Sequence, residues 1–172
     1  MDPIRIAVLT VSDAASRGDR VDTSGDAIRG WAEQRGYAVA EAVVVPDDRA
    51  AIREHLEGMA DGGAIDVILT TGGTGFTERD NTPEVTREVI RREAPGVAEA
   101  LRLEGASSTP MAWLSRGVAG IRSRTLIVNL PGSTGGVREG LAVLDRLLPH
   151  AVQLLRGHDT QTHPGPRAGR DG

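Results

Sequence analysis

The stretch of the sequence that says most about chemistry is the glycine-rich segment Gly72-Gly73-Thr74-Gly75, which follows the apolar run 65–69 almost directly. Glycine permits positive φ and has no side chain, so a strand that ends in such a turn can bring its backbone amides close to an anion. Thr71 and Thr74 add hydroxyl groups to the same turn. The pattern indicates either a phosphate-binding loop or a tight strand-to-helix turn, and the glycines alone leave both readings open.

Acidic residues accompany this turn. Arg79-Asp80 lies just beyond Gly75, and Asp47 follows another apolar run that ends at Val45. Beside a phosphate-binding turn, Asp80 is a candidate ligand for Mg²⁺, which prefers one or two carboxylates together with substrate phosphates. The competing interpretations are a solvated Arg-Asp pair for Asp80 and a helix N-cap, shared with Asp48, for Asp47.

A second glycine-rich turn, 131–136, begins with Pro131-Gly132-Ser133 and could present further amides or be only a turn. Ser115-Arg116 lies in a polar stretch where the arginine could pair with an anionic substrate or be a solvated surface residue.

Composition excludes several classes of enzyme. All 20 basic residues are arginine, so lysine-based catalysis and a Walker-type phosphate loop, which needs Gly-Lys, are absent. The chain has no cysteine, which excludes disulfides, thiolate nucleophiles and Cys-ligated zinc. The histidines do not show ligand spacing, so we assign no metal site to them.

Charge and hydropathy suggest a compartment and a class of partner. The net charge of −4 and the aromatic content of 2% give no attraction to nucleic acid or to acidic membranes. We find no signal peptide and no apolar run of the roughly 18 residues that a membrane span needs, so we expect a cytoplasmic protein.

The expected elements alternate between strands and helices, which predicts an α/β fold with parallel βαβ units in one domain, 1–156. Residues 157–172 are expected to be a disordered tail. The predicted strands cover 4–11, 39–45, 65–70 and 124–130, with a small edge strand near 118–121. The predicted helices cover 25–35 after a Ser24 cap, a segment from Asp48 to about 60, 82–92 with Thr82 as its cap, 96–104, a short one at 110–116, and 137–155.

Ligands of an open parallel sheet bind at the carboxyl ends of its strands. Four loops meet that condition here, and two of them are glycine-rich while two carry acids: 12–25, 46–48, 71–81 and 131–136. We expect them to form one site.

Taken together, the motifs resemble the MogA/MoaB family of molybdenum cofactor biosynthesis proteins over residues 4–156. The matching motifs, in family order and spacing, are Val11-Ser12-Asp13, Pro46-Asp47, Thr71 to Gly75, Arg79-Asp80, Thr82-Pro83-Glu84, Leu114-Ser115-Arg116 and Asn129 to Ser133.

The resemblance implies a single doubly wound, mostly parallel sheet flanked by helices, the molybdopterin-binding fold. It implies an adenylyltransferase that joins the terminal phosphate of molybdopterin to AMP from Mg²⁺-ATP and releases pyrophosphate. Asp47 and Asp80 match the family's essential acids and would be catalytic residues that hold Mg²⁺. The remaining positions that match the substrate and nucleotide site are Ser12, Asp13, Thr71, Gly72, Gly73, Thr74, Gly75, Thr82, Glu84, Ser115, Pro131, Gly132 and Ser133.

This reaction suits the residues, because the substrate's own phosphate is the nucleophile and the protein need only align two polyanions. Two positions depart from the family pattern: Thr134 replaces a proline, and Arg20 stands where an aromatic residue is common. By resemblance we also expect a homotrimer and hand-over to a molybdenum-insertion protein. The alternatives are a non-catalytic molybdopterin carrier of MoaB type and a generic nucleotide-binding domain.

Overall fold

The computed structural model describes residues 1–158, so the expected tail at 157–172 lies almost wholly outside the described residues. One six-stranded sheet runs through the molecule in the order β2-β1-β3-β6-β5-β4. The four strands on one side are parallel, and the last two are antiparallel to their neighbours. Their bounds are β1 Arg5–Val11, β2 Ala38–Val45, β3 Val67–Thr71, β4 Arg92–Glu93, β5 Ala119–Arg122 and β6 Thr125–Leu130.

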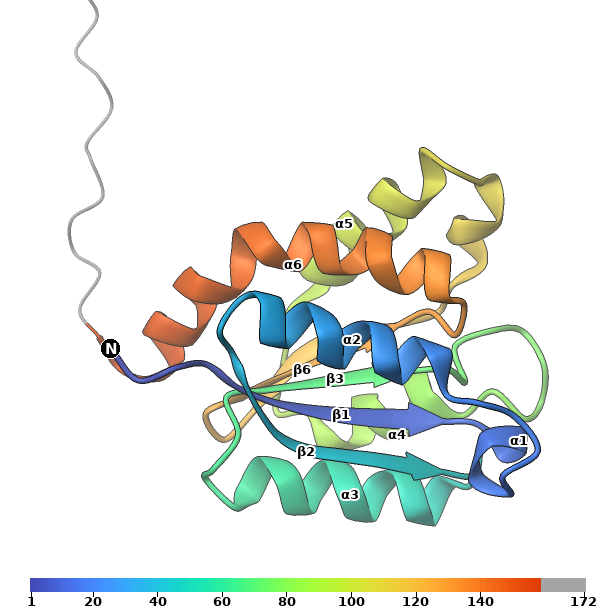
Figure 1. Ribbon diagram of the computed structural model, residues 1–172, viewed down its shortest axis with the longest axis horizontal. Coiled ribbons are helices and arrows are strands. Elements are labelled where there is room, and N and C mark those ends of the chain that lie inside the picture. The colour runs from blue at the N-terminus through green and yellow to red at the C-terminus, as the bar shows by residue number, and fades with distance from the viewer. Residues whose placement is uncertain (159–172) are drawn as a thin grey trace, which may run out of the picture.

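Helices cover both faces of the sheet, which confirms the doubly wound architecture (Figure 1). Two separate apolar cores result. The core on one face includes side chains from α2 (Thr23–Gln34), α5 (Pro95–Ala106) and α6 (Thr134–Leu155). The core on the other face is built with α3 (Arg49–Asp61) and α4 (Thr82–Val89).

The burial of the strands follows from their place in the sheet. β3 and β6 are buried along their whole length, and β1 is buried from Ile6 onward. Strands enclosed by helices on both faces are mostly apolar at successive positions, so they read as near-continuous apolar runs rather than alternating ones. The buried polar residues of β3 and β6 are hydrogen-bonded, as where Asn129 donates to Thr70 Oγ1 at 2.9 Å. β2 is an edge strand and is largely exposed.

Four expectations about local structure were wrong. The 12–25 segment contains a short helix, α1 (Asp13–Ser16), and α2 begins after Asp22, whose side chain accepts from the N–H of Gly25 at 2.9 Å, rather than after Ser24. Asn81 precedes α4, so Thr82 is its first residue and not its cap.

The fourth error concerns the end of α4. This helix stops at Val89, and Arg92–Glu93 forms the short edge strand β4 against β5 instead of continuing the helix to residue 92. The backbone N–H of Arg91 donates to Ile121 O at 2.8 Å, so the chain joins the sheet as soon as the helix ends. Val118 to Ile121 was therefore correctly expected as a strand, but it lies one place in from the edge.

At the amino ends of the parallel strands, the buried carboxylate of Asp66 joins both ends of the described chain. Arg5 and Arg156 both donate to it, with closest distances of 2.8 Å and 2.7 Å. Arg156 also donates to the carbonyl oxygens of Asp2 and Pro3 at 2.9 Å and 2.8 Å. The amino terminus and the end of α6 therefore lie side by side, far from the carboxyl ends of the strands (Figure 1).

None of the helices within residues 1–158 combines the length and the apolar character that crossing a membrane requires.

Candidate active site

The four loops expected to form a site follow four neighbouring parallel strands. β1 lies between β2 and β3, and β6 lies on the far side of β3. Val11 pairs with Val45, Thr10 with Thr71, and Thr71 with Leu130. The residues that come next in each strand therefore share one edge of the sheet, so the expected convergence of these loops is confirmed.

The glycine-rich turn can be built only from glycine at two positions. Gly72 and Gly73 have φ of +93° and +67°. A Cβ on Gly72 would lie 2.2 Å from Val11 O, and one on Gly73 would lie 2.3 Å from Thr82 Oγ1. The turn is therefore packed against its neighbours by backbone, which is the condition for close approach to a ligand.

Hydroxyl groups fix this turn in place. Thr82 Oγ1 donates to Gly72 O at 3.0 Å, and Thr71 Oγ1 donates to Pro131 O at 2.6 Å. Thr71 and Thr82 are buried, so their roles are to hold the two glycine-rich turns in register rather than to present hydroxyls to solvent.

Asp47 and Asp80 approach the turn from two sides. A Cβ on Gly73 would lie 3.2 Å from Asp47 Oδ2, and one on Gly75 would lie 2.9 Å from Asp80 Oδ2. Asp48, not Asp47, caps α3 by accepting from the N–H of Ala51 at 2.9 Å. This division of labour leaves the Asp47 carboxylate free to face the turn.

The environment of Asp47 is poor in solvent. Its exposed fraction is 9%, and its Oδ1 accepts from the N–H of Asn81 at 3.3 Å. Burial raises the pKa of the Asp47 carboxyl, the hydrogen bonds from Asn81 oppose that rise, and the carboxylates of Asp80 and Asp13 add to it. A cation placed beside Asp47 would relieve this accumulation of negative charge.

Asp13 is engaged by protein groups. Its Oδ1 accepts from the N–H of Asp47 at 2.9 Å, and its Oδ2 accepts from Arg79 Nη2 at 2.6 Å. The backbone hydrogen bond from Asp47, followed by the interaction with Arg79, lowers the pKa of Asp13. The structure thus places Asp13 as a support for Asp47, and Arg79 as its ion-pair partner.

The donor set around the turn suits Mg²⁺. The described residues contain no group of three or more His, Asp or Glu side chains placed to hold a metal. Mg²⁺ takes one or two carboxylates when phosphate oxygens complete its coordination. A Cβ on Gly73 or Gly75 would crowd Asp47 Oδ2 or Asp80 Oδ2, so the glycines keep both carboxylates unobstructed at the turn. Two carboxylates at a phosphate-sized turn fit such an ion.

Two cavities open on either side of the second glycine-rich turn. The apolar cavity has a volume of about 440 Å³ and is lined by α5, the first turn of α6 and the short 3-10 helix η1 (Pro110–Leu114). The polar cavity has a volume of about 390 Å³ and lies over the ends of β1 and β3 and the start of α2. Gly132 and Ser133 line both, so this turn is the wall between them.

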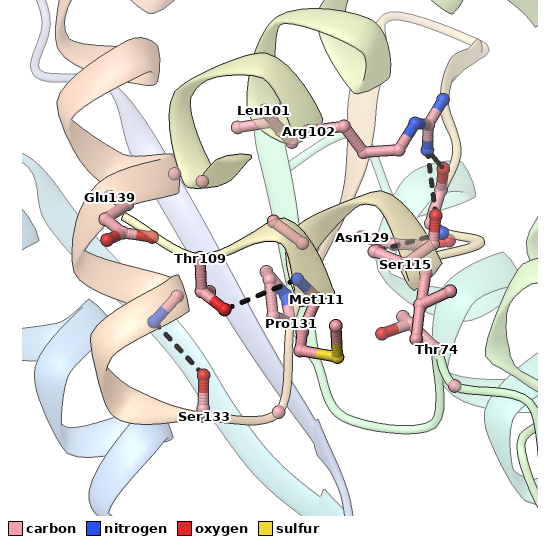
Figure 2. Close-up of a pocket in the computed structure, with 18 of the residues that line it drawn as sticks. Thr74, Leu101, Arg102, Thr109, Met111, Ser115, Asn129, Pro131, Ser133 and Glu139 are labelled. Carbon is pink, nitrogen blue, oxygen red and sulfur yellow. Dashed lines mark hydrogen bonds between the residues drawn. The ribbon is translucent and has the colours of Figure 1, made fainter. Parts of the chain in front are cut away.

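Most of the expected binding residues line one cavity or the other. Figure 2 shows the apolar cavity, with Thr74, Ser115, Pro131 and Ser133 around it. Gly75 and Gly132 also line the apolar cavity, and Ser12, Thr71, Gly72, Gly132 and Ser133 line the polar one. Six expected residues line neither cavity: Asp13, Asp47, Gly73, Asp80, Thr82 and Glu84. Asp80 and Glu84 line a separate open hollow beside Arg116.

The two departures from the family pattern both lie at the polar cavity or its wall. Arg20 lines the cavity next to Asp22, whose Oδ2 accepts from Thr10 Oγ1 at 2.7 Å. The hydroxyl groups of Thr134 and Thr23 lie 3.0 Å apart in a hydrogen bond that joins the starts of α6 and α2. Thr134 thereby ties the second turn to α2.

The sequence did not reveal that α5 and η1 line the apolar cavity. Leu101 and Met111 line the apolar cavity (Figure 2). Met111 and Leu114 are 62% and 46% exposed, because the segment between α5 and β5 lies outside both cores. Large apolar side chains in a short helix between polar loops were the available signal.

Comparison with known proteins gives these features a family. The model of the family described as "Probable molybdopterin binding domain" matches residues 7–150. Solved structures include the molybdopterin biosynthesis enzyme MoaB from Thermus thermophilus, which is 51% identical. The superposition covers 90% of this chain and 97% of that one, with a TM-score of 0.84.

Curated relatives differ in length. The molybdopterin adenylyltransferase of Helicobacter pylori J99 is 39% identical over 95% of this chain and 94% of its own length. The molybdenum cofactor synthesis protein cinnamon of Drosophila melanogaster is 41% identical over 90% of this chain. The chain spans 26% of that protein and about half of another curated relative. The family match and these identities show that the chain belongs to the molybdopterin-binding family of molybdenum cofactor biosynthesis proteins.

Proposed function

We propose that this protein is a molybdopterin adenylyltransferase. An oxygen of the terminal phosphate of molybdopterin attacks the α-phosphorus of ATP, the bond to the β-phosphate breaks, and pyrophosphate leaves with the electron pair. The observation that carries the proposal is the pair of cavities separated only by the Gly132-Ser133 turn, because the reaction needs two phosphorylated ligands to meet end to end. A relative of nearly the same length bears the name of this activity.

The residues of the chain supply positioning and charge rather than a nucleophile. The backbone of Gly72 and Gly132 meets at the wall, where a Cβ on Gly132 would lie 3.4 Å from the Cα of Gly72. Amides from both turns can therefore approach the phosphates at their meeting point. Asp47 and Asp80 would hold Mg²⁺, which when bound neutralises phosphate charge.

The proposal is tested by incubating the protein with ATP, MgCl₂ and molybdopterin and measuring pyrophosphate release. Replacing Asp80 by Asn removes one carboxylate without changing its size. We expect kcat to fall by about 100-fold or more while molybdopterin binding changes little, because the lost charge acts on the transferring phosphate.

Asp48→Asn is the matched control. Asp48 is an acid next to Asp47, but its side chain caps α3, and Asn caps a helix as well as Asp does. This variant should therefore turn over at the wild-type rate. Pterin binding without any pyrophosphate release from the wild-type protein would instead identify the carrier of MoaB type. Stabilisation by nucleotide but not by pterin would identify a generic nucleotide-binding domain.

Further parts of the proposal concern the state of the protein in the cell. We propose a cytoplasmic homotrimer whose binding domain spans 1–156 and which hands its product to a molybdenum-insertion protein. Light scattering coupled to gel filtration measures the oligomeric state directly.

A further inference from the structure

One arginine joins the two ends of the glycine-rich loop. Arg116 lies between η1 and β5, far from the loop in sequence. Its backbone N–H donates to Thr74 O at 3.0 Å. Its side chain donates from Nε to Gly75 O at 2.7 Å and from Nη2 to Asp80 O at 2.8 Å. The residues between Gly75 and Asp80 therefore form a loop whose two ends are bridged by the Arg116 side chain, and we call this bridge the neck. Thr82 joins the chain to Gly72 and Gly73 just below it.

The remaining donors of this guanidinium are mostly engaged as well. Nη1 donates to Glu84 Oε1, and Nη2 lies 3.4 Å from Glu84 Oε2. The hydrogen bond from Arg116 lowers the pKa of Glu84, so the carboxylate stays charged beside it. A guanidinium has five N–H groups, and the bonds to Gly75, Asp80 and Glu84 occupy four of them. Little capacity is left for a substrate anion, which argues against the direct pairing that the sequence allowed.

The neck determines where the Asp80 carboxylate lies. Inside the loop, Asp80 Oδ2 accepts from the N–H of Thr77 at 2.9 Å and from Thr77 Oγ1 at 2.8 Å. The N–H of Asp80 donates back to Thr77 O at 3.1 Å. These bonds fix the carboxylate within the loop. Arg79 and Asn81 attach the far side of the loop to Asp13 and Asp47, whereas Arg116 links Asp80 directly to Gly75.

We propose that Arg116 is a positioning residue for nucleotidyl transfer, which holds Asp80 at the reacting phosphates by clamping Gly75 O and Asp80 O together. The role assigned to Asp80 rests on the proposed function, whereas the clamp itself does not. Lysine cannot replace the clamp, because an ammonium is a point charge and lacks the planar fork that spans two carbonyls and a carboxylate.

The test compares Arg116→Lys with the wild type in pyrophosphate release. We expect kcat to fall by about 10- to 100-fold, as for displacement of a catalytic group by about 1 Å. The KM values for ATP and molybdopterin should change by less than about threefold, because substrate contacts are intact. Hydrogen exchange, followed by mass spectrometry on peptides covering 74–81, should be faster in the variant. Methylguanidinium added to Arg116→Ala should restore part of the lost kcat.

Arg122→Lys is the matched control. Arg122 also spans a carbonyl and a carboxylate, donating to Val89 O at 2.9 Å and to Asp61 Oδ2 at 2.7 Å, but it lies near the other end of the sheet. Its replacement should lower stability while leaving kcat and exchange at 74–81 unchanged. If Arg116→Lys does not fold, Glu84→Gln takes its place, because it loosens the neck through the arginine's third partner and should lower kcat in the same direction.

Three results would overturn the proposal. They are a wild-type kcat in Arg116→Lys, unchanged exchange at 74–81, and a loss confined to the KM of one substrate, which would make Arg116 a direct ligand. Failure of the proposed function looks different: the wild type would release no pyrophosphate, while exchange at 74–81 would still accelerate in Arg116→Lys.

Discussion

Two adjacent acids at the end of β2 perform separate tasks. Asp48 turns toward α3 and caps it, whereas Asp47 is buried beside the glycine-rich turn. The sequence left two roles open for Asp47, a site acid and a helix cap shared with Asp48, because both residues stand at a suitable distance from the helix. The structure separates the two roles. The N–H of Asp47 donates to Asp13, which holds the Asp47 backbone at the end of β2.

Burial of the Asp47 carboxylate predicts that this residue lowers the stability of the fold, although the proposed reaction requires it. Its pKa is raised in the folded state, so ionisation opposes folding above that pKa, and the opposition disappears as the pH falls toward the ordinary value near 4. Asp47→Asn should therefore raise the melting temperature at pH 8 and abolish most pyrophosphate release. Calorimetry between pH 8 and pH 4 should show the gain shrinking, and a lower melting temperature at pH 8 would contradict the idea.

Residue types predicted much of the candidate site but few of its contacts. The glycines, Asp47 and Asp80 were identified by their positions at strand ends, which follow from the α/β pattern. The inward direction of Arg116 could not be predicted, because its partners lie 32 to 41 residues away in sequence. The expected N-caps of α2 and α4 were wrong by two residues and one residue. Asp22 and Asn81 are residue types that suit an N-cap as well as the expected Ser24 and Thr82 do.

At the scale of elements, Asp66 joins β3 to the start of β1 and the end of α6. Burial alone would raise the pKa of Asp66, but the hydrogen bonds from Arg5 and Arg156 outweigh it, and the pKa is lowered well below the usual range. The side chain of Asp66 is 6% exposed, so its two partners are shielded from water on that side. The arrangement fixes the amino ends of the strands, at the opposite end of the sheet from the loops of the candidate site.

Asp66→Asn should destabilise the fold by about 3 kcal/mol at pH 7, the usual effect of removing one partner from a buried ion pair. A lowered pKa stabilises above the unfolded value near 4, and that stabilisation is lost as the pH falls toward the native pKa. Urea unfolding at pH 7 measures the destabilisation, and urea unfolding in strongly acidic solution measures its disappearance. Equal stability of variant and wild type at pH 7 would show that the pair contributes nothing.

Elements with a clear apolar pattern were predictable, including the short η1 and β5, whereas β4 and α1 were not. The stripes of α3 and α6 and the apolar runs of β1, β3 and β6 have enough residues to set a period. β4 has only two residues, Arg92–Glu93, both exposed, so nothing in their types separates them from the helix before. α1 has four residues and begins at a Ser12 cap whose side chain accepts from the N–H of Ala15 at 3.2 Å.

At the scale of the whole molecule, alternation of strands and helices predicted the fold class but not the order of the strands. That β1 lies between β2 and β3, and that β6 returns beside β3, depends on packing of α2 and α6 on one face and α3 and α4 on the other. The same order places the four loops of the candidate site on adjacent strands. The two antiparallel strands β5 and β4 extend the sheet beyond β6. Arg116 lies in the segment that leads into β5.

The contact between Arg156 and the carbonyls of Asp2 and Pro3 predicts that the chain can be circularly permuted. A permutant that joins His158 to Asp2 through a short Gly-Ser linker and opens between the exposed Gly62 and Gly63 should keep the fold and the pyrophosphate release of the wild type. Opening between Gly75 and Phe76 should preserve the sheet but eliminate turnover. Circular dichroism and the same assay measure both, and loss of folding in the first permutant would contradict the prediction.

The closeness of residue 2 to the end of α6 also determines where a fused protein domain would lie. Polypeptide attached before residue 2 or after residue 158 would begin at the amino ends of the strands, whereas both cavities open over their carboxyl ends. Either attachment point therefore leaves the openings of both cavities unobstructed. We expect a domain fused at either end of the described chain to leave the candidate site accessible.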